Sequence, residues 1–332
     1  MTTLSRESRR FCFLLMVLAA VGCGGQKDQG TAMAQSSGAA PARKQQHAGS
    51  PVRTEMRGVN LRIDPNVVLE IRQLRGKLEP TDKDSPPWFD EPSSFMIDIG
   101  EAEIAVTPAS MAAMMNRYVF SGPDAPVKDV GIEIRDGHLI QTATLKKKIP
   151  VHTTLEGDLS VTPEGDIRFH PTKIKAGDLP VKGLLDLFDV ELSEVIKTQE
   201  SRGVRVVDND LILDPERLLP PPRIRGRVTG VRIEGDRIVQ IFGGGEAKDL
   251  SPPLSKAEHY LFYRGGELSF GKVTMHGADL QIIDADPKDP FDFFLSQYQR
   301  QLVAGYSRTL EDRGLVVYMP DSDEAGKGQL AP

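Results

Sequence analysis

The clearest periodic pattern in the chain lies between residues 181 and 201. Apolar side chains recur there three and four positions apart, which is the spacing of one face of an α-helix. The pattern ends at Arg202-Gly203, and Gly203 suits the left-handed residue that often terminates a helix. We therefore predict a long amphipathic helix over residues 181–201. Its apolar face consists of Leu184, Leu185, Phe188, Leu192, Val195 and Ile196.

Segments of alternating apolar and polar residues surround this helix and predict β-strands. The apolar parity changes at Gly100 within the segment 94–106, which indicates a β-bulge. Residue pairs typical of tight turns separate the other alternating segments. These turns are expected at Asp136-Gly137, Glu156-Gly157, Glu164-Gly165, Asp208-Asn209-Asp210, Glu234-Gly235-Asp236 and His276-Gly277.

Two further helices are expected. Thr107-Pro108 combines a capping residue with a proline at the first helical position, and it predicts a helix to about Phe120. Met111, Met114 and Met115 share one face of that helix. A second amphipathic helix is expected over residues 290–312. Its apolar stripe contains Phe291, Phe294, Leu295, Tyr298, Leu302, Tyr306 and Leu310.

These elements together predict an α+β fold. A strongly curved, mostly antiparallel sheet would wrap around the long amphipathic helix, and a second helix would follow near the C-terminus. Strands that recur every eight to twelve residues are typical of sheets that curl.

The first 23 residues have the pattern of a processing segment. Basic residues precede the apolar run Phe11–Val21. The small residues at its end, Ala20-Val21-Gly22, lie directly before Cys23. This resembles a bacterial lipobox, which implies cleavage before Cys23 and acylation of its thiol, so that the mature protein is anchored to a membrane. An ordinary signal peptide cut near Gly22 or Ala34 is the alternative, and either Sec or twin-arginine export fits the basic start.

The expected domain organisation follows from composition. Residues 1–22 form the signal peptide, and residues 23–54 form a disordered tether rich in Gly, Gln, Ser, Ala and Lys. A single folded domain spans residues 55–319, and a polar tail occupies residues 320–332. Both cysteines, Cys12 and Cys23, precede the folded domain, so cysteine catalysis and cysteine–zinc sites are excluded there.

The formal net charge is −6, and no basic patch with interleaved aromatic residues is present, so we expect no nucleic-acid partner. The six histidines are scattered, and the acidic run Asp284, Asp286, Asp289 and Asp292 lacks the spacing of a calcium loop. We therefore expect no metal, no cofactor and no catalytic activity. Two features could contact lipid headgroups, although a fold-back of Trp88 onto the domain and a solvated strand face for the arginines are the favoured explanations. They are Trp88 and the series Arg223, Arg225, Arg227 and Arg232.

Residues 171–220 carry a family resemblance. A strand ending near Gly177 and Leu179-Pro180 leads to the predicted helix, and strands follow around Leu213-Asp214-Pro215. This order resembles bacterial LmeA-like proteins, which are similar to the tubular lipid-binding superfamily. The resemblance covers about residues 60–240, rests on element order, and transfers no individual ligand residue. It implies a sheet wrapped around a helix, with acyl chains held between them.

Three functional hypotheses follow. The first is a non-catalytic lipoprotein of the bacterial envelope that binds phospholipid or another amphiphile between the helix 181–201 and the sheet, with Met111, Met114 and Met115 lining the same groove. The second is a structural lipoprotein with a protein-filled core, whose helix 290–312 docks on a protein partner that the sequence does not identify. The third is an envelope hydrolase, which requires His259 or His276 beside a serine and a carboxylate.

Overall fold

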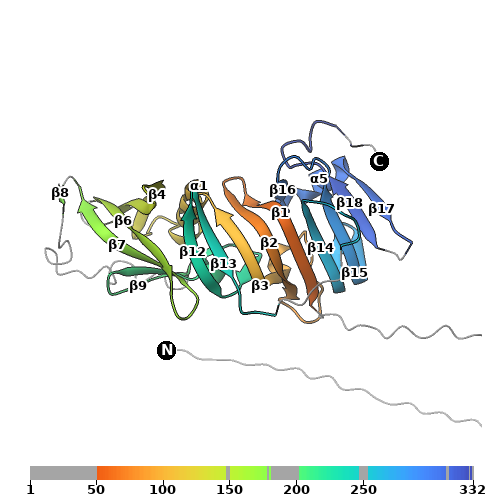
Figure 1. The fold of residues 1–332 in the computed structure, drawn as a ribbon, viewed down its shortest axis with the longest axis horizontal. Helices are drawn as coiled ribbons and strands as arrows, with labels where there is room; N and C mark the ends of the chain where they lie inside the picture. The colour runs from red at the N-terminus through yellow and green to blue at the C-terminus, as the bar shows by residue number, and fades with distance from the viewer. Residues whose placement is uncertain are drawn as a thin grey trace, which may run out of the picture. The chain divides into compact units, whose positions relative to one another are not determined.

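β-Strands dominate the part of the chain that the computed structural model describes (Figure 1). It describes residues 51–146, 150–177, 179–180, 202–246, 253–311, 314–328 and residue 330. The predicted signal peptide, most of the tether and Cys23 therefore lie outside the described residues. The predicted helix 181–201 lies outside them as well.

Eleven strands of the described part form one sheet, sheet A. Nine of them follow the order β12-β13-β3-β2-β1-β14-β15-β18-β17, while β11 lies parallel beside β3 and β16 lies parallel beside β1. The strands are β1 (Val52–Asp64), β2 (Val67–Pro80), β3 (Phe95–Val106), β11 (Arg223–Arg225), β12 (Val228–Glu234), β13 (Arg237–Phe242), β14 (Tyr260–Phe270), β15 (Val273–Asp284), β16 (Phe291–Phe294), β17 (Tyr306–Thr309) and β18 (Leu315–Met319).

Seven described strands form a second sheet, sheet B, in which every pairing is antiparallel. Its order is β4-β5-β6-β7-β10-β9, and the two-residue β8 pairs with β7. The strands are β4 (Val127–Arg135), β5 (His138–Leu145), β6 (Val151–Val161), β7 (Ile167–Ala176), β8 (Leu179–Pro180), β9 (Val204–Val207) and β10 (Asp210–Leu213).

The described helices are short. Thr107 caps α1 (Pro108–Met114), because its side-chain oxygen accepts a hydrogen bond from the Ser110 amide, and η2 (Met115–Val119) continues the same helix. This helical start is confirmed. The remaining helices are η1 (Pro92–Ser94), α4 (Pro215–Leu218), η4 (Leu295–Gln297) and α5 (Tyr298–Ala304).

One hydrophobic core joins the two sheets. It contains inward-facing residues of sheet A, such as Leu61 and Ile71, together with Phe169 and Leu211 of sheet B. Sheet A carries a second, smaller core on its other face, built from Tyr260, Phe262, Ile283 and Val316. Leu254 and Ala257 pack against that second core from the segment that precedes β14.

The expected α+β fold is wrong. The described residues form two sheets with short helices, and none of those helices is long and amphipathic with a sheet wrapped around it. Within the described residues, apolar side chains at helical spacing such as Phe291 and Phe294 belong to a strand instead, because β1 supplies a long-range partner.

The predicted helix over residues 290–312 is also wrong. Residues Phe291–Phe294 form β16, which pairs in parallel with residues 59–62 of β1. Only Tyr298–Ala304 is α-helical, and Tyr306–Thr309 returns as β17. Phe291 and Phe293 are fully buried, whereas Asp292 between them forms an ion pair with Arg62 at 2.9 Å. The segment therefore follows the two-residue period of a strand.

The bulge at Gly100 is confirmed, since Arg75 pairs with Glu101 and Gly76 pairs with Ile99, which leaves Gly100 unpaired with β2. The turns at 136–137, 164–165, 208–209 and 234–236 are also where the sequence places them. Two predicted turns are wrong. Gly157 lies at a register shift inside β6, and the turn of the last long hairpin is at Gly271-Lys272 rather than His276-Gly277.

Both ends of the predicted domain differ from expectation. β1 begins at Val52, inside the segment expected to be a tether. Residues 320–328, expected to be a disordered tail, form turns that hydrogen-bond to the domain. For example, the Asp292 amide donates to Asp321 Oδ1 at 2.6 Å, and the Leu330 amide donates to the Ala304 carbonyl at 2.8 Å.

Candidate functional site

Sheet B presents one continuous apolar face. Its strands alternate, and their register places apolar side chains opposite one another from one strand to the next. Cross-strand partners on this face include Leu155 with Ile174, Leu159 with Phe169, and Leu211 with Val206. We name this surface the sheet B apolar face. It consists of Val127, Val130, Ile132, Ile134, Leu139, Ala143, Leu145, Val151, Leu155, Leu159, Val161, Ile167, Phe169, Ile174, Val204, Val206, Leu211 and Leu213.

Burial divides this face into two zones. Near its centre, Ile167 and Phe169 are 2% and 1% exposed and belong to the main core. Toward its margins the side chains pack against the core but keep solvent-accessible surface. The half-buried members that pack against the core are Ile132, Ile134, Leu145, Leu159, Val161, Ile174 and Val206, and Val151 is half-buried as well. The described residues thus leave apolar surface on the margins of sheet B.

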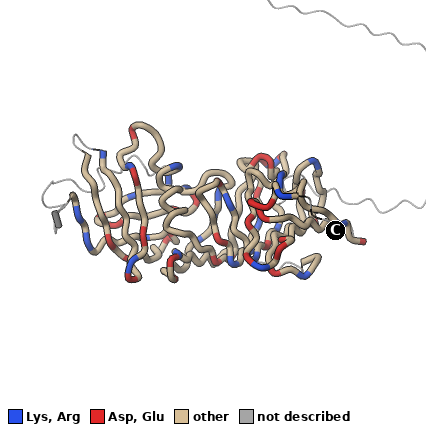
Figure 2. The backbone as a smooth tube through the Cα atoms, turned by 90° about the horizontal axis from the view of Figure 1, so that it is seen from above, with Lys and Arg blue, Asp and Glu red and all other residues tan. Residues whose placement is uncertain are grey.

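The opposite face of sheet B is mostly polar, although Ile140 and Ile212 lie on it and are buried. His138 Nδ1 lies 2.7 Å from Asp158 Oδ1, and Asp210 accepts from both His170 Nδ1 at 2.6 Å and Arg168 Nε at 3.0 Å. Charges of both signs are interspersed along the chain (Figure 2). Exposed pairs of this kind contribute little to stability, but they keep this face hydrated. The sheet therefore has one face suited to water and one suited to apolar groups.

Helix α1–η2 holds β4 against the core through Asn116. Its Nδ2 donates to the Val130 carbonyl at 2.8 Å, and its Oδ1 accepts from the Val130 amide at 2.9 Å. The β4–β5 register shifts between Lys128 and Gly131, so Asn116 satisfies backbone groups at that irregularity. Arg202 Nη1 donates to the carbonyls of Val119 and Ser121 at the end of the helix.

The predicted groove residues fall into two groups. Met111, Met114 and Met115 are buried in the main core, at 3%, 6% and 4% exposure. The helix-face residues Leu184, Leu185, Phe188, Leu192, Val195 and Ile196 lie outside the described residues. The structure thus places the methionines on the buried face of the helix rather than on an open surface. The six helix-face residues cannot be placed. The marginal residues of sheet B were missed, although their strict alternation was visible in the sequence.

Three of the four arginines in the series 223–232 are occupied within the protein. Arg225 forms ion pairs with Glu79 and Asp98, and Arg232 forms ion pairs with Glu103 and Glu234. Arg227 donates to the Pro163 and Glu164 carbonyls. These contacts account for the three residues within the solvated outer surface, and we assign them no ligand.

Carboxylates gather where β15 ends. Asp284 is 4% exposed, its Oδ1 accepts from the Asp286 amide at 2.9 Å, and its Oδ2 has no hydrogen-bond partner. Burial, with added repulsion from Asp321, Asp286 and Asp289, raises the pKa of Asp284 to about 7. Burial likewise raises the pKa of Asp321 to about 6. No group of three or more His, Cys, Asp or Glu side chains within the described ranges is arranged to hold a metal ion.

The histidines do not assemble a hydrolytic site in the part of the chain that is described. His276 Nδ1 contacts Glu267 Oε1 at 2.6 Å on the surface. His259 Nδ1 is buried without a partner, and its ring packs directly over Gly58. Neither ring hydrogen-bonds a serine there, so the hydrolase hypothesis gains no support.

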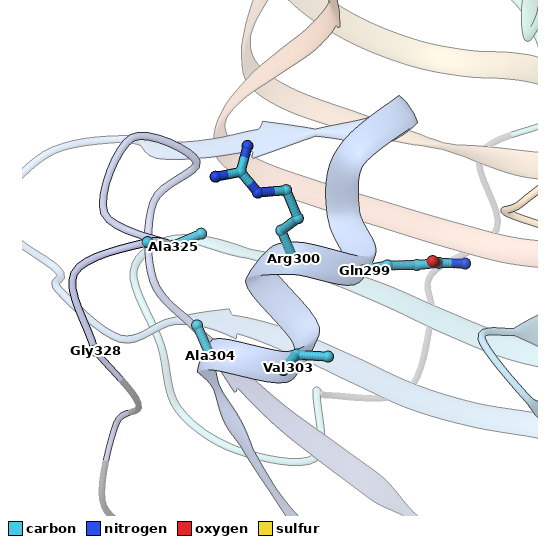
Figure 3. A pocket seen from close by; sticks show the side chains of 7 residues that line it. Gln299, Arg300, Val303, Ala304, Ala325 and Gly328 are labelled. Atoms are coloured by element: carbon cyan, nitrogen blue, oxygen red, sulfur yellow. The ribbon is translucent and has the colours of Figure 1, made fainter.

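An open depression of about 530 Å³ lies between α5 and residues 325–328 (Figure 3). Its walls are mostly small or apolar, and Arg300 is the charged group on them. Nothing in its lining combines an acid, a base and a nucleophile. The lining residues are Gln299, Arg300, Val303, Ala304, Ala325, Gly326 and Gly328.

Comparisons of this chain with protein-family models, with curated proteins and with solved structures found no match. The resemblance to LmeA-like proteins therefore stays a prediction. Among the helices of the described residues, none is long and apolar enough to cross a membrane.

Proposed function

We propose that this protein is a membrane-tethered lipoprotein of the bacterial envelope that binds lipid acyl chains, or another amphiphile, on the sheet B apolar face. The observation that supports this proposal most directly is the half-buried margin of that face. Seven apolar side chains there contact the core on one side and retain solvent-accessible surface on the other.

Burial of apolar surface supplies the binding energy. An acyl chain that lies on this margin removes both its own methylenes and the marginal side chains from water. Each buried methylene contributes about 0.8 kcal/mol, so a chain segment of several methylenes compensates for the entropy lost on binding. The interaction needs no chemistry beyond burial, and the proposed protein is a carrier or binding protein rather than an enzyme.

The membrane tether in this proposal comes from the sequence. Acylated Cys23 would anchor the mature chain on the extracytoplasmic side of a membrane, and the following residues would leave the domain free to reorient. Two acyl chains hold a protein on a bilayer stably, whereas one is marginal.

The rival hypothesis is a structural lipoprotein that docks helix 290–312 on a protein partner, and the structure does not form that helix. The helix expected over 290–312 was to present an exposed apolar stripe to a partner. In the structure Phe291, Phe294, Leu295 and Tyr298 of that stripe are buried, at 0%, 7%, 5% and 2% exposure. Lipid binding on sheet B is therefore the function that the geometry supports best.

The proposal is tested by mass spectrometry of organic extracts. The chain from residue 24 onward is purified from a bacterial host without detergent. We expect phospholipid or another amphiphile in stoichiometric amount. Val206 faces the apolar margin and Val207, its neighbour on the same edge strand, is 47% exposed on the other face. Val206→Glu should lower the lipid content at least about tenfold, and the matched control Val207→Glu should leave it unchanged.

A lipid-free extract from the folded wild-type chain would overturn the proposal. Equal lipid content in the Val206→Glu and Val207→Glu proteins would place the ligand elsewhere. Circular dichroism confirms that both variants are folded before the extracts are compared.

A further inference from the structure

Three large apolar side chains are exposed at one end of sheet A. Trp88 is 45% exposed, Val273 is 51% exposed and Val303 is 75% exposed. They come from three separate elements: the loop between β2 and β3, the first residue of β15 and helix α5. We name these three residues the tip surface.

Hydrogen bonds hold the three elements together. The Phe89 amide donates to the Ser269 carbonyl at 3.1 Å, which fixes the Trp88 loop along the end of β14. Trp88 Nε1 donates to Asp90 Oδ2 at 3.1 Å, and Asp90 Oδ1 accepts from Gln299 Nε2 at 2.8 Å on α5. The tip surface is therefore a fixed arrangement rather than three independent side chains.

Contacts at the hairpin turn complete this arrangement. The Gly271 amide donates to the Tyr298 hydroxyl at 2.8 Å, which joins the β14–β15 turn to the start of α5. Gln299 and Val303 point to the same side of α5 (Figure 3). Val303 thus lies one helical turn beyond the residue that contacts the Trp88 loop.

The chain enters the domain at this same end. β1 begins at Val52, and Arg53 pairs with Arg264 of β14 in antiparallel register. From Arg264, β14 runs on to Phe270, directly before the turn. The beginning of β1 therefore points toward the tip surface, at a distance along the sheet of roughly 20 Å for six residues. The chain that precedes it leads back to Cys23.

We propose that the tip surface docks on the interface of a lipid bilayer. A tryptophan with its N–H hydrogen-bonded and its ring exposed is suited to the boundary between headgroups and acyl chains. Val273 and Val303 add apolar area beside it. The inference rests on the membrane tether of the proposed function, because a chain anchored at Cys23 brings the entry point of β1, and with it the tip surface, toward the bilayer. It does not depend on lipid binding by sheet B.

Charges around the tip surface define the expected mode of contact. Lys272 is exposed and forms no ion pair with any described residue, so it is available to lipid phosphates. Arg300 instead points away from Val303 toward residues 325–328 (Figure 3), and its Nη1 donates to Gln297 Oε1 at 3.1 Å. Asp82 and Asp84 are exposed on the same loop as Trp88 and oppose an anionic surface. Apolar insertion therefore dominates over net charge, and we expect docking to persist at high salt.

Trp88 reports on this contact directly, because it is the one tryptophan of the 332-residue chain. The chain from residue 24 is mixed with vesicles of phosphatidylethanolamine and phosphatidylglycerol at about 3:1, a composition chosen to give a moderately anionic surface. We expect the Trp88 emission to shift to shorter wavelength and lipids brominated on the acyl chains to quench it. Co-sedimentation should give the bound fraction.

Variants separate the tip surface from other contacts. The double variant Val273→Asp/Val303→Asp keeps the Trp88 reporter and should weaken vesicle binding at least about tenfold. The control Val207→Asp removes a valine of sheet B that is exposed about as much as Val273 and should bind vesicles like the wild type. Val206→Glu should also dock normally, so a failure of lipid binding by sheet B is distinguishable from a failure of docking.

Two results would overturn the inference. Unchanged emission together with absence from the vesicle pellet would show that the tip surface does not contact a bilayer. A concentration-dependent dimer that Val273→Asp/Val303→Asp converts to monomer, with vesicles without effect, would assign the surface to a second copy of this chain instead.

Discussion

Asp284 shows how one buried carboxyl group makes the stability of this domain depend on pH. The side chain is 4% exposed and one of its oxygens has no hydrogen-bond partner. Burial raises its pKa to about 7 from the ordinary value of 3.8. The folded state therefore retains this proton at pH values where the unfolded chain has already lost it.

The sign of the effect follows from that difference. Below about pH 4 both states carry the proton, and the contribution of Asp284 to stability is fully present. As pH rises from about 4 to 7 the unfolded state loses its proton first, so this contribution is lost. The raised pKa of Asp321, about 6, acts in the same direction.

Asp284→Asn should remove most of this dependence. The amide oxygen can still accept from the Asp286 backbone, and no charge has to be buried. We expect the variant and the wild type to unfold at similar temperatures at pH 4, and the variant to unfold several degrees higher at pH 8. Thermal unfolding followed by circular dichroism measures this. Asp124→Asn, whose wild-type side chain is 95% exposed, is the control, and an equal rise in that protein would contradict the explanation.

At the scale of elements, Asn116 is the clearest link between the helical part and sheet B. It pairs with both backbone groups of Val130, where β4 departs from regular register. Asn116→Ala leaves a donor and an acceptor without their partner. We expect a loss of about 1–3 kcal/mol in the free energy of unfolding, measured by urea denaturation.

A matched substitution checks that this loss belongs to the contact. Asn66 lies exposed in the turn between β1 and β2, and Asn66→Ala should change the free energy of unfolding by no more than about 0.5 kcal/mol. If both substitutions cost the same, the Asn116–Val130 pairing does not stabilise the fold beyond an ordinary surface position.

Local signals in the sequence predicted local structure well. Thr107-Pro108 begins a helix, Gly100 marks a bulge, and Asp136-Gly137 turns a hairpin. Each of these features depends on the conformational preference of one or two residues. A sequence can specify them without reference to the rest of the chain.

Long-range pairing was not predictable in the same way. The spacing of Phe291, Phe294, Leu295 and Tyr298 satisfies a helix, yet β1 supplies a parallel partner more than 200 residues away, and Phe291 and Phe293 fill the core as strand residues. The pattern at His276-Gly277 likewise resembles a turn, but the hairpin turns at Gly271, which has a φ of +57°. The choice between such alternatives is made by partners that lie far away in sequence.

The two candidate sites also combine features that the sequence shows with features that only long-range packing decides. The apolar alternation of β6 and β7 was visible in the sequence, but which of its members stay half-exposed depends on how sheet B packs against the core. Trp88 is visible in the sequence as a lone tryptophan on a polar loop. Val273 and Val303 carried no signal, because single exposed valines are ordinary. Their proximity to Trp88 exists only in the folded chain.

At the scale of the whole molecule, the proposed tether and the two surfaces make different demands on the membrane. Anchoring needs the Cys23 thiol, whereas docking of the tip surface and lipid binding by sheet B need only the folded domain. A protein whose lipid-binding face is held near a bilayer by both an anchor and a docking surface exchanges lipid with that bilayer without dissociating from it. The anchor is therefore the part whose removal should weaken membrane attachment without unfolding the protein.

Cys23 can be tested against the one other cysteine of the chain, Cys12. Cells that express the full-length protein are fed an alkyne-bearing fatty acid, and the protein is isolated and its label detected after coupling to a fluorophore. We expect a labelled wild-type protein that fractionates with membranes and resists extraction by high salt. Cys23→Ser should abolish the label, because the acyl chains have no thiol to attach to, while Cys12→Ser should retain both label and membrane association.

Label that persists in Cys23→Ser would show that the anchor is not at this residue. An unlabelled wild-type protein in the soluble fraction would favour the ordinary signal peptide, and the tip surface would then be the remaining candidate for membrane contact.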